Sequence, residues 1–229
     1  MPESLNTADE NIRANRQKWD KDHPWPEDGD EWKGQAIDCN VPYRQWKQSL
    51  IDNLIAPNVT SGMHVLEIAP GHGRWTEVLL ARARKVSAVD LSQNCLDFCS
   101  RRFAGQNIAF FLTNGNSLPP EFTGSIDFLW SYDAFVHMAP DVVEAYFREI
   151  ARVLKRDARA IVHHADIENP NTHEQRGSYG WRSAVSAAMV RRFADDAGLK
   201  VLSQITYWDE ARRIGAPRHN DKITMLQKA

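Results

Sequence analysis

The sequence predicts an α/β fold in which helices cover both faces of a mostly parallel sheet. Three observations support this fold. Apolar segments of strand length alternate with helical segments from residue 62 onward, one helical segment is clearly amphipathic, and a turn rich in glycine follows the first strand directly. Such alternation is typical of parallel strands joined by helices. A chain of 229 residues that is 42% apolar can form one domain of this kind with a modest extension.

The predicted strands are short apolar segments bounded by polar or turn-forming residues. They cover residues 64–68, 85–89, 108–112, 125–130, 159–164, 201–208 and 222–227. Helices are predicted over residues 74–83, 92–104, 140–154 and 184–197, and apolar side chains recur at helical spacing in the third of them. The last two strands are separated by a stretch without a good helix, which favours an antiparallel return. We therefore expect seven strands, with an antiparallel last strand.

The first 60 residues differ in character from the rest, because they show no strand pattern and contain several tryptophans. We expect a helix near residues 7–20, an irregular loop through about residue 35 and a second helix near residues 42–56. Residues 1–60 are therefore predicted to be a helical extension of a domain formed by residues 61–229. The extension either caps a bound ligand, with Tyr43 and Trp46 as candidates, or covers one edge of the sheet.

Composition argues against several classes of function. A net charge of -2 gives no support to nucleic-acid binding. The apolar stretches are far shorter than the roughly 20 residues that span a bilayer, and the N-terminus does not resemble a secretory signal. Cys39, Cys95 and Cys99 form no disulfide framework and are expected to be buried thiols. We expect a cytoplasmic protein without a membrane span.

The segment HVLEIAPGHGRW, residues 64–75, is the sharpest local signal. An apolar strand enters Gly71-His72-Gly73, and a helix follows at once. Glycine permits a tight turn and close approach of the backbone to a ligand, and the helix start offers free N–H groups to an anion such as a carboxylate. His72 is expected to point outward and to serve the turn.

Two carboxylates strengthen this prediction of a nucleotide site. Glu67 lies inside the apolar strand, where it requires a hydrogen-bonding or cationic partner, which a ligand can supply directly or through water. Asp90 ends the next strand and can accept both hydroxyls of a ribose. A nicotinamide dehydrogenase would place a third glycine at the position of Thr76, so the sequence argues against that class.

Together, LEIAPGHGRW and the later AVDLS resemble the class I S-adenosylmethionine-dependent methyltransferases over roughly residues 60–229. The resemblance implies a Rossmann-like methyltransferase fold and S-adenosyl-L-methionine as cofactor. In this chain Asn116 replaces the usual acid of the adenine segment, and Asp157-Ala158 replaces a usual glycine pair. The cofactor residues that the resemblance implies are Glu67, Ala69, Gly71, Gly73, Trp75, Asp90, Leu91, Asn116, Ser117 and Ser131.

Methyl transfer from a sulfonium mainly requires positioning, and a hydroxyl acceptor also benefits from a base or a metal. Asp133 and His137 follow the fourth strand and are expected on one face of a short helical turn. His163 and His164 end the fifth strand, and only one of them should face the pocket. The predicted catalytic residues are His137, Asp133 and His164. His137 could also be structural or a metal ligand; a divalent metal on these residues is possible but not favoured.

The long polar segment 166–182 has no periodicity and suits a lid over the acceptor, or else a solvent loop anchored by Trp181. His163, Tyr179, Trp181 and Arg182 are the predicted acceptor contacts. A narrower resemblance to bacterial methyltransferases of sugars and polysaccharides favours a small-molecule or glycan hydroxyl as acceptor. N- or carboxyl methylation, a nicotinamide-dependent oxidoreductase and a non-catalytic nucleotide-binding module are the alternatives.

Overall fold

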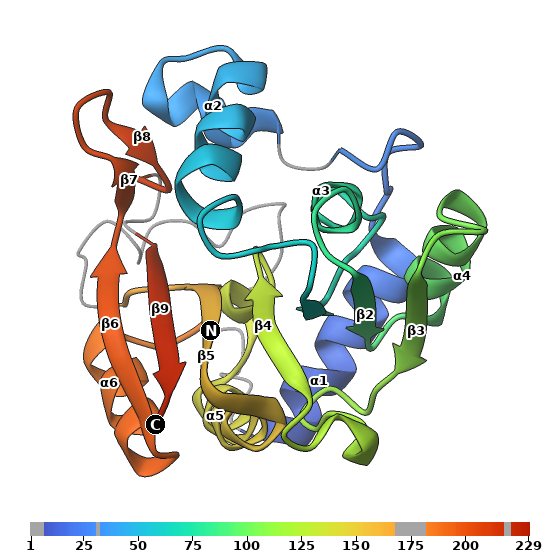
Figure 1. The fold of residues 1–229 in the computed structure, drawn as a ribbon, viewed down its shortest axis with the longest axis vertical. Helices are drawn as coiled ribbons and strands as arrows, with labels where there is room; N and C mark the ends of the chain where they lie inside the picture. Colours follow the sequence, from blue (N-terminus) through green and yellow to red (C-terminus); the bar gives the residue numbers. More distant parts are fainter. Residues whose placement is uncertain (1–6, 31–32, 168–181, 218–220) are drawn as a thin grey trace.

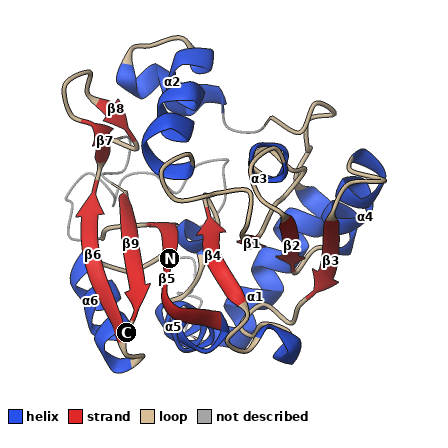
Figure 2. Cartoon of the chain, in the orientation of Figure 1, coloured by secondary structure: helices blue, strands red, loops and turns tan. Residues whose placement is uncertain are grey.

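The computed structural model describes residues 7–30, 33–167, 182–217 and 221–229. A seven-stranded sheet runs through the centre of the molecule (Figures 1 and 2). Its strands, in the order in which they lie, are β3 (Ile108–Leu112), β2 (Lys85–Asp90), β1 (His64–Ile68), β4 (Ile126–Ser131), β5 (Leu154–His164), β9 (Lys222–Lys228) and β6 (Leu199–Ile205). β9 is antiparallel to both of its neighbours, whereas the pairs from β3 to β5 are parallel. The predicted sheet is confirmed.

The helices also follow the predicted order, with differences at their ends. They are α1 (Ala8–Arg16), α2 (Tyr43–Leu50), α3 (Thr76–Leu80), α4 (Gln93–Arg102), α5 (Pro140–Val153) and α6 (Ala187–Asp196). Two helices continue as π-helices, η1 (Gln17–Asp22) after α1 and η3 (Ile51–Ile55) after α2. α3 starts later than predicted because the glycine turn occupies the residues before Thr76, and it also ends earlier, at Leu80.

Two local predictions are wrong. The loop expected through residue 35 contains the start of a 3-10 helix, η2 (Lys33–Cys39), whose Ala36 is buried. The strand expected over residues 201–208 is interrupted after Ile205, and β7 (Tyr207–Asp209) pairs with β8 (Ile214–Gly215) in a separate two-stranded sheet. This small sheet lies beside α2 (Figure 1).

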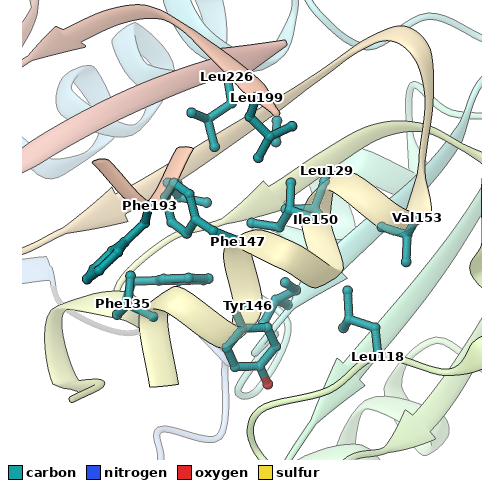
Figure 3. Packing of buried hydrophobic residues seen from close by; sticks show 14 of the residues in the cluster. Leu118, Leu129, Phe135, Tyr146, Phe147, Ile150, Val153, Phe193, Leu199 and Leu226 are labelled. Atoms are coloured by element: carbon teal, nitrogen blue, oxygen red, sulfur yellow. The ribbon is translucent and has the colours of Figure 1, made fainter. Parts of the chain in front are cut away.

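Side chains alternate between two apolar layers, one on each face of the sheet. On β4, Leu129 belongs to the layer under α5 and α6, whereas Phe128 and Trp130 belong to the layer under α2 and η3. Figure 3 shows the first layer, in which Phe147 and Ile150 of α5 pack among residues of β4, β9 and α6. Helices therefore cover both faces, as predicted.

The direction of the strand order reverses between β1 and β4, and ligands of open α/β sheets bind at such a point. The residues just beyond these two strands, Ala69 and Asp133, have φ angles of 59° and 65°. Side chains other than glycine rarely adopt this conformation, and it is concentrated at functional sites. The fold therefore directs attention to the C-terminal ends of β1 and β4.

Candidate functional site

A pocket lies at the C-terminal ends of β1, β2 and β4. Ala69, Gly71, Asp90 and Leu91 line one side of it, and Asp133 lines another. The N-terminal segment covers it, since side chains of α1, η1 and the following turn also line it. The pocket thus combines the glycine turn with residues that are distant in the sequence.

The two glycines of the turn have different surroundings. Both have positive φ angles, 55° for Gly71 and 90° for Gly73. A Cβ on Gly71 would lie 2.6 Å from the Trp25 ring, over the pocket, whereas a Cβ on Gly73 would lie 2.5 Å from the Phe103 ring at the end of α4. Gly71 therefore faces the pocket, and Gly73 permits close packing of the turn on α4.

Glu67 is buried below the turn and accepts a hydrogen bond of 2.6 Å from the Thr76 hydroxyl. Burial raises its pKa to about 8, although the Thr76 bond opposes this shift. The partner that the sequence required is thus a residue of the chain itself. Thr76 occupies the position where a dinucleotide fingerprint would have its third glycine.

Asp90 ends β2 and lines the pocket. Its two carboxylate oxygens accept hydrogen bonds from the backbone N–H groups of Ser92, at 2.9 Å, and Gly71, at 3.4 Å. Burial raises the pKa of Asp90 to about 6 against these bonds, so the side chain is mainly a carboxylate at neutral pH. An ionised carboxylate at this edge can accept hydrogen bonds from the hydroxyl groups of a ligand.

The prediction for His72 is wrong, because its ring does not point outward. It stacks on Phe98, with ring centroids 3.7 Å apart, and on Trp25, at 4.9 Å. The imidazole therefore connects the N-terminal segment to α4 through aromatic contacts.

Asp133 is held as a carboxylate by three side chains. Arg74 donates to one oxygen at 2.5 Å, and His163 Nδ1 and Gln35 contact the other at 3.0 and 2.9 Å. Burial opposes ionisation, but the His163 hydrogen bond and the Arg74 charge bring the pKa of Asp133 well below its ordinary value. Such a carboxylate accepts hydrogen bonds well and is a weak base.

Asp133 and His137 do not share one helical turn as predicted. The short 3-10 helix η5 (Phe135–His137) starts only after Asp133, whose positive φ angle places it outside the helix. His137 nevertheless lines the same pocket, and its ring lies 4.9 Å from the ring of Trp19. The structure therefore brings the two side chains to one pocket by a different backbone path.

His163 and His164 point to opposite sides of the sheet, as the alternation of side chains along a strand requires. His163 faces Asp133, while His164 is fully buried, with Nδ1 at 2.7 Å from the Ala165 carbonyl and Nε2 at 2.7 Å from the Thr224 hydroxyl. Burial lowers the pKa of His164 to about 4. The structure thus places the side chain of His164, a predicted catalytic residue, against Thr224 of β9, and neither His164 nor the predicted acceptor contact His163 lines the pocket.

The other predicted site residues differ in their surroundings. Trp75 and Leu91 line the pocket, whereas Ser131 is buried and donates to the Ile68 carbonyl at 3.0 Å. Asn116 and Ser117 donate their backbone N–H groups to Asn114. Tyr179 and Trp181 lie outside the described residues, and Arg182 forms an ion pair with Asp221.

Neither Tyr43 nor Trp46, the two residues predicted to cap the ligand, lines the pocket. Trp46 is fully buried and donates its indole N–H to the Gly215 carbonyl at 2.9 Å, so it anchors α2 to β8. Tyr43 donates its hydroxyl to Asp30. The pocket is covered instead by Trp19 and Trp25, which line it from the N-terminal segment.

Sequence reasoning missed Arg74, Asn11, Asn15 and Asp221. Arg74 directly follows the glycine turn, and this position is the only feature of the sequence that could have indicated a role in the site. Asn11 and Asn15, one helical turn apart, both donate to the His137 carbonyl, at 3.1 and 3.0 Å. Their polar side chains on α1 gave no indication of this contact.

No group of three or more His, Cys, Asp or Glu side chains among the described residues has an arrangement suited to a metal ion. In the described part of the chain, no helix combines the length and apolar character that crossing a membrane requires.

Comparison with known proteins identifies the central segment. Residues 65–157 match the family profile of a methyltransferase domain. The fold is similar to magnesium protoporphyrin IX methyltransferase of Synechocystis PCC 6803, with 17% identity, a TM-score of 0.67 and coverage of 96% of this chain and 97% of that one. The fold is also similar to an S-adenosylmethionine-dependent methyltransferase of Clostridium acetobutylicum ATCC 824. The identity is 14%, the TM-score is 0.66, and the match covers 85% of this chain and 95% of that one. Residues 65–157 thus match a methyltransferase domain, and the chain has the Rossmann-like fold of the S-adenosylmethionine-dependent methyltransferases.

Curated relatives match only in part. Ribosomal RNA small subunit methyltransferase A of Mycoplasmopsis pulmonis is 28% identical over 78 residues, 34% of this chain and 30% of that protein. A probable enzyme of the same name from Methanospirillum hungatei JF-1 is 48% identical over 46 residues, 20% of this chain and 18% of its own length. The match to the methyltransferase domain identifies S-adenosyl-L-methionine as the cofactor.

Proposed function

We propose that the protein transfers a methyl group from S-adenosyl-L-methionine to a hydroxyl of a small molecule. One observation carries the proposal: a single pocket joins the glycine turn and Asp90 to Asp133 and His137. Residues suited to hold a nucleotide thus share a space with residues suited to bind and deprotonate an acceptor. The cofactor, when bound, supplies the activated methyl group, and the chain supplies positioning.

The described residues fit this cofactor. Asp90 presents a carboxylate suited to ribose hydroxyls, and Leu91 and Gly115 line the pocket near it. Gly71 leaves room where a Cβ would fill the space under Trp25. We assign the ribose to Asp90 and the amino-acid part to the side of Gly71 and Ala69.

The N-terminal segment acts in this proposal as a cap that excludes water. Asn11 is bound on both sides of its amide, because it donates to the His137 carbonyl and accepts from the Ala139 N–H at 2.9 Å. A covered pocket suits a small acceptor better than a macromolecule. Residues 1–60 are thus proposed to be a cap, and residues 61–229 the methyltransferase domain.

On the acceptor side we propose different roles for two side chains. Asp133 orients the acceptor, because its low pKa makes it a poor proton acceptor. His137 is the candidate general base for the acceptor hydroxyl. Arg74 offsets the charge of Asp133, which favours an uncharged acceptor. A sugar or glycan hydroxyl is our preferred acceptor; this choice also draws on the resemblance of the sequence to sugar methyltransferases.

The proposal is tested in two steps. S-adenosylhomocysteine should raise the melting temperature, and NAD(P) should not. Methyl transfer from labelled S-adenosylmethionine is then measured with neutral sugars, small phenols, amines, carboxylates and ribosomal RNA. Turnover of the sugars or phenols supports the proposal. Stabilisation by NAD(P) alone, or turnover of RNA alone, would contradict it.

His137→Gln separates the two parts of the proposal. The variant should bind S-adenosylhomocysteine as the unmodified protein does and lose about 100-fold or more of the transfer rate. The half-buried His23 of the N-terminal segment is unsuitable as a control because its ring contacts Trp19. Arg148→Gln, on the exposed side of α5, is a better control and should keep full activity.

A further inference from the structure

Five side chains form a continuous chain of charges that starts at the pocket. The order is Arg74, Asp133, His163, Asp221 and Arg182. His163 is at the centre and is only 1% exposed. Its Nδ1 lies 3.0 Å from Asp133 Oδ1, and its Nε2 lies 3.3 Å from Asp221 Oδ2, an ion-pair contact without hydrogen-bond geometry. The imidazole is therefore held between two carboxylates.

Both carboxylates have their own cationic partner. Arg74 contacts Asp133 at 2.5 Å, and Arg182 pairs with Asp221 just before β9. Burial opposes ionisation of Asp221, but the Arg182 charge lowers its pKa to about 2. Both acids therefore remain carboxylates at neutral pH, and neither can donate a proton to His163.

This arrangement limits the protonation state of His163. A neutral imidazole has a lone pair on one ring nitrogen, and either tautomer would direct that lone pair at a carboxylate. Nδ1 also lies 3.2 Å from the Asp133 N–H, which would suit an unprotonated nitrogen. That tautomer, however, places the Nδ1 lone pair 3.0 Å from the Asp133 carboxylate. Only the imidazolium presents a donor to both acids.

The other neighbours of His163 agree with a cation. The Tyr132 ring stacks on the imidazole, with centroids 4.3 Å apart and planes 22° apart, and an aromatic face attracts a positive charge. His164, the next residue, is neutral because burial lowers its pKa to about 4. Burial opposes the charge on His163, but the nearby carboxylates of Asp133 and Asp221 raise its pKa above the ordinary value.

We propose that His163 is a positioning residue that remains an imidazolium and fixes the Asp133 carboxylate on the pocket wall, with Asp221 as its second support. The role in methyl transfer rests on the proposed function, because Asp133 is the acceptor-orienting group there. Loss of the proton from His163 would remove a donor from Asp133. Transfer should therefore decline as pH rises through the pKa of His163.

The protonation state can be measured without any acceptor. In protein labelled with ¹⁵N-histidine, the two ring nitrogens of His163 should both give protonated signals at pH 7. These signals are assigned by their absence in His163→Gln. A neutral His163 at pH 7 overturns the proposal, whether or not the protein transfers methyl groups.

Asp221→Asn tests the positioning role. The variant should move the alkaline limb of the kcat/KM profile to lower pH by about one unit and leave S-adenosylhomocysteine affinity unchanged. Asp209→Asn, which changes an ion pair on β7, is the matched control and should leave the profile in place. A uniform loss of kcat with an unmoved limb contradicts the proposal. Failure of the protein to bind S-adenosylhomocysteine would contradict the proposed function alone.

If Asp221→Asn does not fold, the pH titration of His163 in the unmodified protein tests the proposal instead. The expected titration midpoint lies above the ordinary histidine range, and a midpoint below it overturns the proposal.

Discussion

Asp20 in the N-terminal segment accepts a hydrogen bond of 2.8 Å from the hydroxyl of Ser92, the N-cap of α4. The same carboxylate oxygen accepts from the Asn94 N–H at 3.0 Å. Asp20 thereby places a negative charge at the positive end of α4. Burial opposes its ionisation, but these bonds and Lys21 lower the pKa of Asp20 to about 2. The contact fastens the cap to the helix that follows Asp90.

Asp20→Ala should therefore loosen the cap. Charge-assisted hydrogen bonds contribute about 1.5–3 kcal/mol, so we expect opening and S-adenosylhomocysteine release to become about tenfold faster or more. Stopped-flow fluorescence can follow release, since Trp19 and Trp25 line the pocket. Asp22→Ala, at an exposed carboxylate two residues away, should leave the release rate unchanged. Equal release rates in all three proteins would show that the contact does not hold the cap.

The raised pKa of Asp90 predicts a pH dependence of cofactor affinity. The ionised carboxylate accepts hydrogen bonds from two hydroxyls more strongly than the protonated acid does, and the pKa of Asp90 is about 6. Affinity for S-adenosylhomocysteine should fall as pH decreases through 6, by at most about tenfold per unit. Calorimetric titrations between pH 5 and 8 test this. Asp90→Asn should bind weakly, without that dependence; a parallel decline in the variant would assign the effect to another group.

The raised pKa of Glu67 predicts that the folding stability of the protein falls as pH rises, a trend opposite to that of cofactor affinity. Its pKa rises from 4.5 in the unfolded chain to about 8 in the folded protein, so between these values the folded state binds more protons. Its contribution is therefore largest below pH 4.5 and is lost as pH rises toward 8, by up to a few kcal/mol. Urea unfolding at pH 6 and 9 should show that Glu67→Gln improves relative to the unmodified protein at pH 9. A constant difference would contradict this assignment.

The two glycines of the turn should respond differently to substitution. Alanine at either position is strained by the positive φ angle, by about 1–2 kcal/mol. Gly71→Ala also displaces Trp25 and should weaken S-adenosylhomocysteine binding more than it lowers the melting temperature. Gly73→Ala meets Phe103 in the core, so its main effect should be on melting temperature. The reverse ranking, measured by calorimetry and thermal unfolding, would contradict our placement of the cofactor.

Much of the fold could be predicted because its information is local. The apolar positions of α5, from Val142 to Val153, repeat at helical spacing and are buried as expected. β1 and Asp90 at the end of β2 were recognisable from one stretch of sequence each. The 3-10 helix η2 was missed, because its residues have no strong periodicity and part of its packing is against β8, which lies far along the chain.

The interior of the site depended on contacts that no local pattern encodes. Arg74 and Asp133 are 59 residues apart, and only the adjacency of β1 and β4 brings them together. Alternation required that His163 and His164 face opposite ways, but the neighbouring structure decided which one meets Asp133. Asp221 lies 58 residues beyond His163 and could not be paired with it from spacing.

The position of β9 has a consequence for the folding pathway. β9 follows β6 in the chain but lies between β5 and β6 in the sheet. Until residues 222–228 insert, β6 has no strand through which to join the sheet, and β5 presents an unpaired edge to other chains. Strand insertion should therefore be a late step of refolding. A synthetic peptide with the sequence of residues 222–228 could compete with β9 for the position between β5 and β6. Such a peptide would offer a way to control assembly of the protein.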